Sequence, residues 1–72
     1  MVYTLIKIKY TYSFKETEGT YSDVLYVRKN DFISYDKNSC ERLVRFYLTE
    51  YDVSRYFVAI LDIEDLGLRF YA

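Results

Sequence analysis

The sequence predicts a small α+β fold: a single domain over residues 1–72 in which one amphipathic helix packs on a four-stranded, mainly antiparallel sheet in the order β-β-α-β-β. Three observations predict this class. One long segment alternates apolar and polar residues with the period of a strand, a later segment has the period of a helix, and strand-like runs lie on both sides of that helix. A chain of 72 residues has room for one domain.

The N-terminal segment, residues 2–14, has the clearest strand pattern, because apolar and polar side chains alternate along it. Such alternation places the apolar residues on one buried face and leaves the other face to solvent. The face expected to be buried carries Val2, Ile6, Ile8, Tyr10, Tyr12 and Phe14, and the outer face carries Tyr3, Leu5, Lys7, Lys9, Thr11 and Ser13.

A hairpin turn is expected at Glu18-Gly19, because glycine supplies the positive φ that a tight turn between two strands requires. A turn at these two residues fixes which residues of the two strands oppose each other, and it brings apolar residues together on one face. The expected pairs are Tyr12 with Leu25 and Tyr10 with Val27 on the buried face, and Thr11 with Tyr26 and Lys9 with Arg28 on the outer face.

Residues 40–51 have the pattern of an amphipathic helix, in which apolar residues recur every three or four positions. The expected apolar stripe consists of Cys40, Leu43, Val44, Tyr47, Leu48 and Tyr51. Asn38 and Glu41 have the spacing of a capping box, which gives Asn38 the role of N-cap. A polar connection over residues 30–38 joins the second strand to this helix.

Two further strands are expected after the helix. Residues 55–63 form a nearly continuous apolar run rich in β-forming residues, which is typical of a central strand covered on both faces. Residues 64–67 are expected to form a turn, because two acidic residues and a glycine lie there, and residues 68–71 are expected to form a short last strand.

The composition argues against an enzyme. The chain has ten tyrosines and five phenylalanines but no histidine, which is the usual general base and the commonest metal ligand. The single cysteine, Cys40, begins the apolar stripe and is interpreted as a buried thiol. Asp62, Glu64 and Asp65 are interpreted as solvated residues around a turn rather than as a cation site. The sequence therefore predicts no catalytic residue, metal site or cofactor.

Charge and hydropathy restrict the environment and the partners. A net charge of −1 lacks the basic excess of proteins that bind duplex nucleic acid. The sequence has no apolar run of transmembrane length, and its first residues lack the continuous apolar segment of a signal peptide. One unpaired cysteine fits a reducing compartment, so the expected location is the cytoplasm, without a membrane partner.

The candidate site is the sheet face opposite the helix, because a single helix covers only one face of a sheet. An uncovered aromatic and aliphatic surface is typical of binding interfaces, in which tyrosine and arginine contribute most of the binding energy. The residues expected to form it are Tyr3, Tyr26, Tyr56, Val58, Ile60 and Tyr71, with Lys7, Lys9 and Arg28 steering and orienting the complex.

Three functions are compatible with this pattern. The first is a non-enzymatic protein-interaction module that binds and occludes a larger protein, and in size and character the chain is similar to small inhibitors and accessory proteins of phages and mobile elements. The second is a single-stranded nucleic-acid binder that uses Lys7, Lys9, Arg28 and Tyr26. The third is a structural homodimer, formed through sheet faces or through edge strands.

Overall fold

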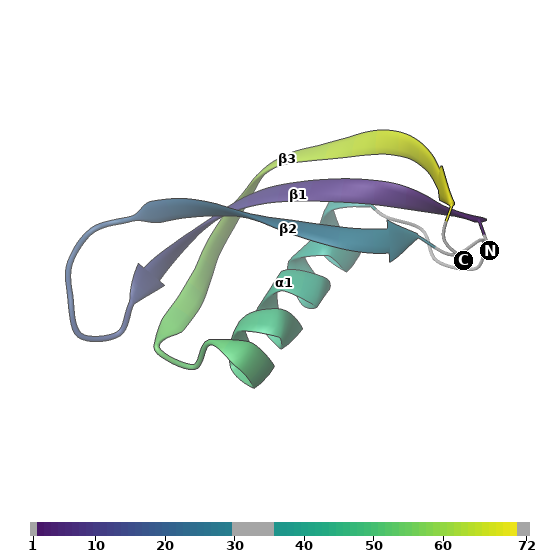
Figure 1. Ribbon diagram of the computed structural model, residues 1–72. Helices are drawn as coiled ribbons and strands as arrows, with labels where there is room; N and C mark the ends of the chain where they lie inside the picture. The colour runs from purple at the N-terminus through teal and green to yellow at the C-terminus, as the bar shows by residue number, and fades with distance from the viewer. Residues whose placement is uncertain (1, 30–35, 71–72) are drawn as a thin grey trace.

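The computed structural model describes residues 2–29 and 36–70, and within these ranges the chain forms three strands and one helix (Figure 1). The elements are β1 at Val2–Phe14, β2 at Tyr21–Lys29, α1 at Lys37–Tyr51 and β3 at Arg55–Phe70. Both strand pairs are antiparallel and the order is β2-β1-β3, so the N-terminal strand is the central one. The helix crosses one face of the sheet, and no other described element covers the opposite face (Figure 1).

The fold is α+β, as the sequence predicts. The expected four-stranded sheet with the order β-β-α-β-β is wrong, since the described chain has three strands in the order β-β-α-β. The chain continues as one strand through residues 64–67, where the sequence predicts a turn. The pairing with β1 shifts by one residue at this point, between Thr4 and Ile6. Gly67 has a φ of +84°, and the Asp65 carboxylate accepts a hydrogen bond from the Gly67 N–H at 2.8 Å. Glycine therefore introduces a bulge into the strand instead of reversing its direction.

Strand β3 is an edge strand, not the central strand that its apolar run predicts. Its pairing with β1 shifts at two further places, between Lys9 and Tyr10 and between Thr11 and Tyr12. Each shift adds one residue to β3, so its half-buried residues recur every three positions instead of every two. These residues are Phe57, Ile60, Ile63 and Leu66, and the two residues between each of them and the next are exposed. The apolar run therefore reflects a bulged edge strand rather than burial on both faces.

The β1–β2 hairpin has a loop over residues 15–20 instead of a two-residue turn at Glu18-Gly19. The Ser13 hydroxyl donates a hydrogen bond to the Gly19 carbonyl at 2.9 Å, and Gly19 has a φ of +112°, which glycine adopts without strain. The longer loop makes the four predicted cross-strand pairs wrong: Tyr26 lies opposite Lys7, for example, and not opposite Thr11. The register differs by an even number of positions, so each strand keeps its predicted inner and outer faces.

The N-cap of α1 is Asp36, not the predicted Asn38. Asp36 Oδ1 accepts a hydrogen bond from the Ser39 N–H at 2.8 Å, which satisfies one of the unpaired donors of the first helical turn. Hydrogen bonding from Ser39 lowers the pKa of the Asp36 carboxyl, because it stabilises the charged form. Most of the predicted connection over residues 30–38 lies outside the described residues.

The buried core joins alternate residues of β1 to one side of α1. Its members are Ile6, Ile8, Tyr10 and Tyr12 from β1, and Cys40, Val44 and Leu48 from α1. The alternation predicted for β1 is therefore confirmed over the middle of the strand. The helix buries a narrower stripe than predicted, since Tyr47 is 36% exposed and Tyr51 is 76% exposed. Because the single helix buries only this narrow stripe, much of the sheet remains accessible to other molecules.

Candidate functional site

The outer face of the sheet, turned away from α1, is crossed by a ladder of side chains from all three strands. Its two central rungs, read from β2 through β1 to β3, are Tyr26–Lys7–Glu64 and Val24–Lys9–Asp62. The outer face, as the term is used below, consists of these six residues together with Tyr3, Leu5, Arg28, Val58 and Leu61. The register of the strands, rather than any local sequence motif, brings these residues together.

The ladder is electrically balanced. Lys7 has Glu64 as its cross-strand neighbour on β3, and Lys9 has Asp62. Opposite charges at directly opposed positions of antiparallel strands attract, and the two lysines and two carboxylates together carry no net charge. The sequence pattern predicts both carboxylates in a turn and does not indicate this arrangement, because only the bulged register of β3 places them opposite the lysines.

Exposed apolar side chains lie along both edges of the ladder. Tyr26 on β2 is 57% exposed, and Val58 and Leu61 on β3 are 45% and 54% exposed. Val58 and Leu61 are the extra residues at two of the register shifts of β3, since neither has a partner on β1. The bulges therefore turn two aliphatic side chains to solvent. Leu61 is not among the predicted site residues, because regular alternation gives no signal for a bulged residue.

Two other predicted site residues, Ile60 and Tyr56, lie away from the exposed centre of the outer face. Ile60 is half-buried and packs against the core, which corrects the expectation that it is exposed. Tyr56 is 49% exposed but lies opposite Ser13, at the hairpin end of β1, whereas Tyr26 lies opposite Lys7. The predicted tyrosines therefore do not form one continuous patch.

The far end of the outer face holds one aromatic–cation contact. Tyr3 is half-buried, and the Arg28 guanidinium lies 5.0 Å from the centre of its ring. This distance is typical of a cation–π interaction, so the Arg28 side chain contacts the sheet as well as solvent. Tyr71 lies outside the described residues.

A second cluster occupies the inner face at the hairpin end, and Arg55 is at its centre. Three rings contact one another with centroids 5.5 to 5.8 Å apart: Tyr12, Phe14 and Tyr21. The Arg55 guanidinium lies 4.2 Å from the centre of the Tyr12 ring, and it pairs with Asp52 at 2.9 Å and with Asp23 at 3.2 Å. Arg55 thus connects the start of β3 to both hairpin strands and to the end of α1. No local pattern in the sequence indicates this role, because most of these partners are distant in the chain.

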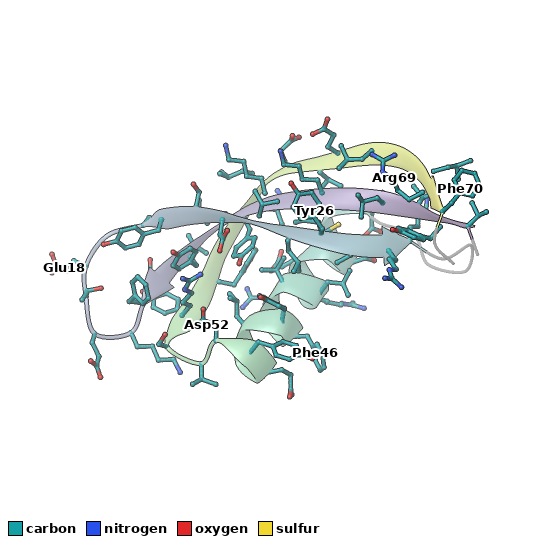
Figure 2. All side chains as sticks on the ribbon, viewed as in Figure 1. Glu18, Tyr26, Phe46, Asp52, Arg69 and Phe70 are labelled. Carbon is teal, nitrogen blue, oxygen red and sulfur yellow. The ribbon has the colours of Figure 1, made fainter. Side chains whose placement is uncertain are left out.

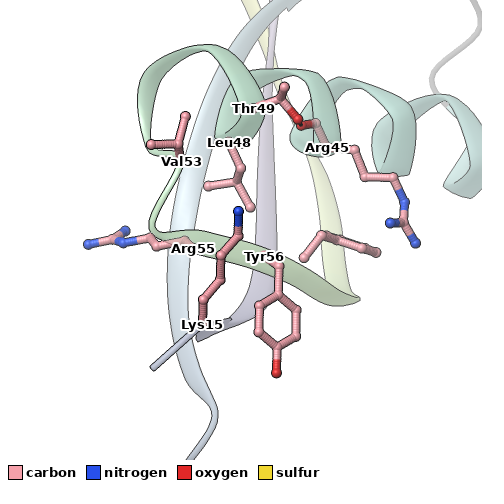
Figure 3. Close-up of a pocket in the computed structure, with 8 residues that line it drawn as sticks. Lys15, Arg45, Leu48, Thr49, Val53, Arg55 and Tyr56 are labelled. Atoms are coloured by element: carbon pink, nitrogen blue, oxygen red, sulfur yellow. Dashed lines mark hydrogen bonds between the residues drawn. The ribbon is translucent and has the colours of Figure 1, made fainter. Parts of the chain in front are cut away.

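An open hollow lies beside this cluster, between α1 and the start of β3 (Figure 3). Its lining residues are Lys15, Arg45, Leu48, Thr49, Val53, Arg55, Tyr56 and Phe57. Arg45 pairs with Glu41 at 3.0 Å and lies 4.8 Å from the centre of the Phe57 ring, and the Thr49 hydroxyl donates to the Arg45 carbonyl at 2.9 Å. The contact with Phe57 joins the helix to β3, whereas the other two lie within α1, and the lining contains no pair of a nucleophile and a base.

The single thiol of the chain, Cys40, is unreactive because it is buried. Cys40 is completely buried, and burial, followed by the negative charge of Asp36, raises the pKa of its thiol. The predicted burial of Cys40 is therefore confirmed. Residues 2–29 and 36–70 contain no group of three or more side chains placed to hold a metal ion.

No family model, curated protein or solved structure matches this chain. Within the described ranges, no helix combines the length and the apolar character needed to cross a membrane.

Proposed function

We propose that this chain is a non-catalytic protein-interaction module that binds a larger protein through the outer face of its sheet. One observation carries the proposal: a single helix covers one face of the sheet, and the other face presents exposed Tyr26, Val58 and Leu61 around a balanced charge ladder. Apolar side chains interspersed with charges of both signs are typical of the surfaces through which two folded proteins bind.

The charge ladder favours a protein over a nucleic acid as the partner. A strand of nucleic acid would approach Lys7 and Lys9 together with Glu64 and Asp62, which repel phosphate. A protein surface carries charges of both signs and can match this alternation, which aligns the partner along the strands. We therefore do not retain the single-stranded nucleic-acid reading.

The mode of action we propose is occlusion. A three-stranded face covers a partner surface without acting on it chemically, and Arg28 and the two ladder lysines orient the complex while Tyr26 and Leu61 supply apolar contact. The single buried thiol, Cys40, fits a reducing compartment, and we place the protein in the cytoplasm.

The test is affinity capture with a tagged chain from extracts of the cells that produce it, at low and high salt. The variant Leu61→Asp places a charge on the outer face, and the matched control Phe46→Asp places one on the helix, where Phe46 is 63% exposed on the side away from the sheet (Figure 2). We expect the unmodified chain and Phe46→Asp to retain one discrete protein at high salt. Leu61→Asp should not retain it.

Three results would contradict the proposal. The first is recovery of nucleic acid that high salt removes, which would restore the nucleic-acid reading. The second is equal capture by Leu61→Asp and Phe46→Asp, which would move the contact away from the outer face. The third is loss of capture by Phe46→Asp alone, which would assign the contact to α1.

A further inference from the structure

The two edges of the sheet differ in their regularity. Strand β3 forms one edge and is interrupted by three register shifts, which distort its outer row of backbone groups. Strand β2 forms the other edge, and its pairing with β1 runs from Tyr21 to Lys29 without a shift. Natural sheets commonly protect an edge with bulges, proline or charge. The centre of β2, residues 24–27, reads Val-Leu-Tyr-Val and has none of these devices.

One hydrogen bond shows which backbone groups of β2 point to the open edge. The Val24 N–H donates to Oδ1 of its neighbour Asp23 at 2.8 Å, so this N–H is directed away from β1. Hydrogen-bonding direction alternates along a strand in an antiparallel pair. The backbone groups of Tyr26, two residues further on, therefore point to the open edge as well.

We propose that β2 is the dimerisation edge of this protein and that it pairs antiparallel with β2 of a second copy, with the two-fold axis at Tyr26. In this register an aromatic pair, an apolar pair and an ionic pair form, and Val24 lies opposite Arg28. The pairs are Tyr26 with Tyr26, Leu25 with Val27, Val24 with Arg28 and Asp23 with Lys29 of the second copy. The aromatic pair and the Val24–Arg28 pairs lie on the outer face, and the apolar and ionic pairs lie on the helix side.

The neighbouring symmetric register is less complementary. With the axis at Leu25, Asp23 would meet Val27 and Lys29 would meet Tyr21, so both charges would lose an opposite partner. With the axis at Tyr26, Asp23 Oδ1 exchanges the Val24 N–H for the Lys29 ammonium of the second copy, while Oδ2 keeps its pair with Arg55. Charge complementarity therefore selects one register.

This arrangement is closed and leaves no regular edge. The strand order becomes β3-β1-β2-β2-β1-β3, so the only edges still open in the described sheet are the two bulged β3 strands. Because the axis is perpendicular to the sheet, both helices lie on one side and the two outer faces join into a single surface. The dimer thus doubles the proposed contact surface, although its formation does not depend on that function.

The size and shape of the chain agree with an additional subunit. Its radius of gyration is 13.3 Å, whereas a compact domain of 72 residues has about 11 Å. Its accessible surface is 5337 Å², against roughly 4,800 Å² for a compact monomer of this mass. A small domain with a surplus of exposed surface gains stability by burying part of it against a second copy.

The first test is mass determination by sedimentation equilibrium over a range of concentrations. The unmodified chain should reach twice its 8.8 kDa mass. Tyr26→Pro removes an N–H that points to the open edge, so it should give a folded monomer. Tyr26→Thr keeps this N–H, and threonine favours strands, so this variant should dimerise more readily than the proline variant. A monomer at every concentration, or a Tyr26→Pro chain that dimerises as the unmodified chain does, would overturn the proposal.

The second test reports the register and does not depend on the proline variant folding. A cysteine at the two-fold axis meets its own copy, so Tyr26→Cys should form an intermolecular disulfide under mild oxidation. Leu25→Cys should cross-link much less, and Tyr56→Cys on β3 serves as an exposed control that should form no intermolecular disulfide. The native Cys40 is buried and does not interfere. Preferential cross-linking of Leu25→Cys, or of Tyr56→Cys, would refute the register or the edge.

Discussion

Replacement of Arg55 by alanine should destabilise the fold well beyond the effect expected for a surface arginine. The guanidinium lies 4.2 Å from the Tyr12 ring centre and pairs with Asp52 and Asp23, and its side chain is only 25% exposed. A cation–π contact at a partly exposed site contributes about 0.5–1 kcal/mol. Each partly exposed ion pair contributes about 0.2–1 kcal/mol. The expected loss is therefore roughly 1–3 kcal/mol of the free energy of unfolding.

Such a loss is large for a domain of this size. A single small core supplies about 3–5 kcal/mol of net stability, and each kcal/mol moves the melting temperature of a 60–100-residue domain by about 4–8 °C. Urea unfolding followed by far-ultraviolet circular dichroism measures the change. Arg55→Lys keeps the charge but loses the planar guanidinium, so it should lie between Arg55→Ala and the unmodified chain.

The matched control is Arg69→Ala, since Arg69 is also an arginine of β3 but is exposed. It should change the unfolding midpoint little. If Arg55→Ala and Arg69→Ala had the same midpoint, the cluster at the hairpin end would not hold the elements together as described.

Three further predictions concern single groups. Cys40 should resist a thiol reagent in the folded protein and react fully in denaturant, because it is completely buried and burial raises its pKa; fast labelling under native conditions would contradict this. Burial, with a contribution from Asp23, also raises the pKa of Tyr10, so the folded state holds this proton more tightly than the unfolded state. Stability should therefore fall as the pH rises past about 10, and urea titrations across this range should show a smaller fall for Tyr10→Phe. Asp36→Ala should lower the melting temperature more than Asn38→Ala does. The lowered pKa of Asp36 shows that its charged form stabilises the fold, so the difference between the two variants should shrink in acid as Asp36 is protonated. Equal effects of the two variants at neutral pH would contradict the assignment of Asp36 as the N-cap.

The parts of the fold that the sequence predicts well are those set by local patterns. Alternation in β1 predicts its buried residues, since Ile6, Ile8, Tyr10 and Tyr12 form its side of the core. The three-and-four spacing predicts α1, although the cap lies two residues earlier than the capping-box pattern indicates. Both patterns arise from the geometry of one element and need no knowledge of its neighbours.

The parts that the sequence does not predict depend on how strands meet. A bulge leaves almost no trace in sequence, so β3 was divided into two strands and assigned to the centre of the sheet. The same bulges leave Ile60 half-buried against the core, where it was expected to be exposed, and they leave Leu61 exposed. Tyr26 was placed on the correct face because the error in the hairpin register was even. The sequence therefore predicts the face on which Tyr26, Lys7 and Lys9 lie, but not the charge ladder that crosses it.

The measurement that most directly tests the central claim, that the outer face contacts another protein, is lysine footprinting of the captured complex. An amine-reactive reagent and mass spectrometry report the modification of each lysine with and without the partner. We expect protection of Lys7 and Lys9 on the outer face, while Lys15 in the hairpin loop and Lys37 at the start of α1 react as in the free chain. Protection of Lys15 or Lys37 with Lys9 still fully reactive would contradict the account.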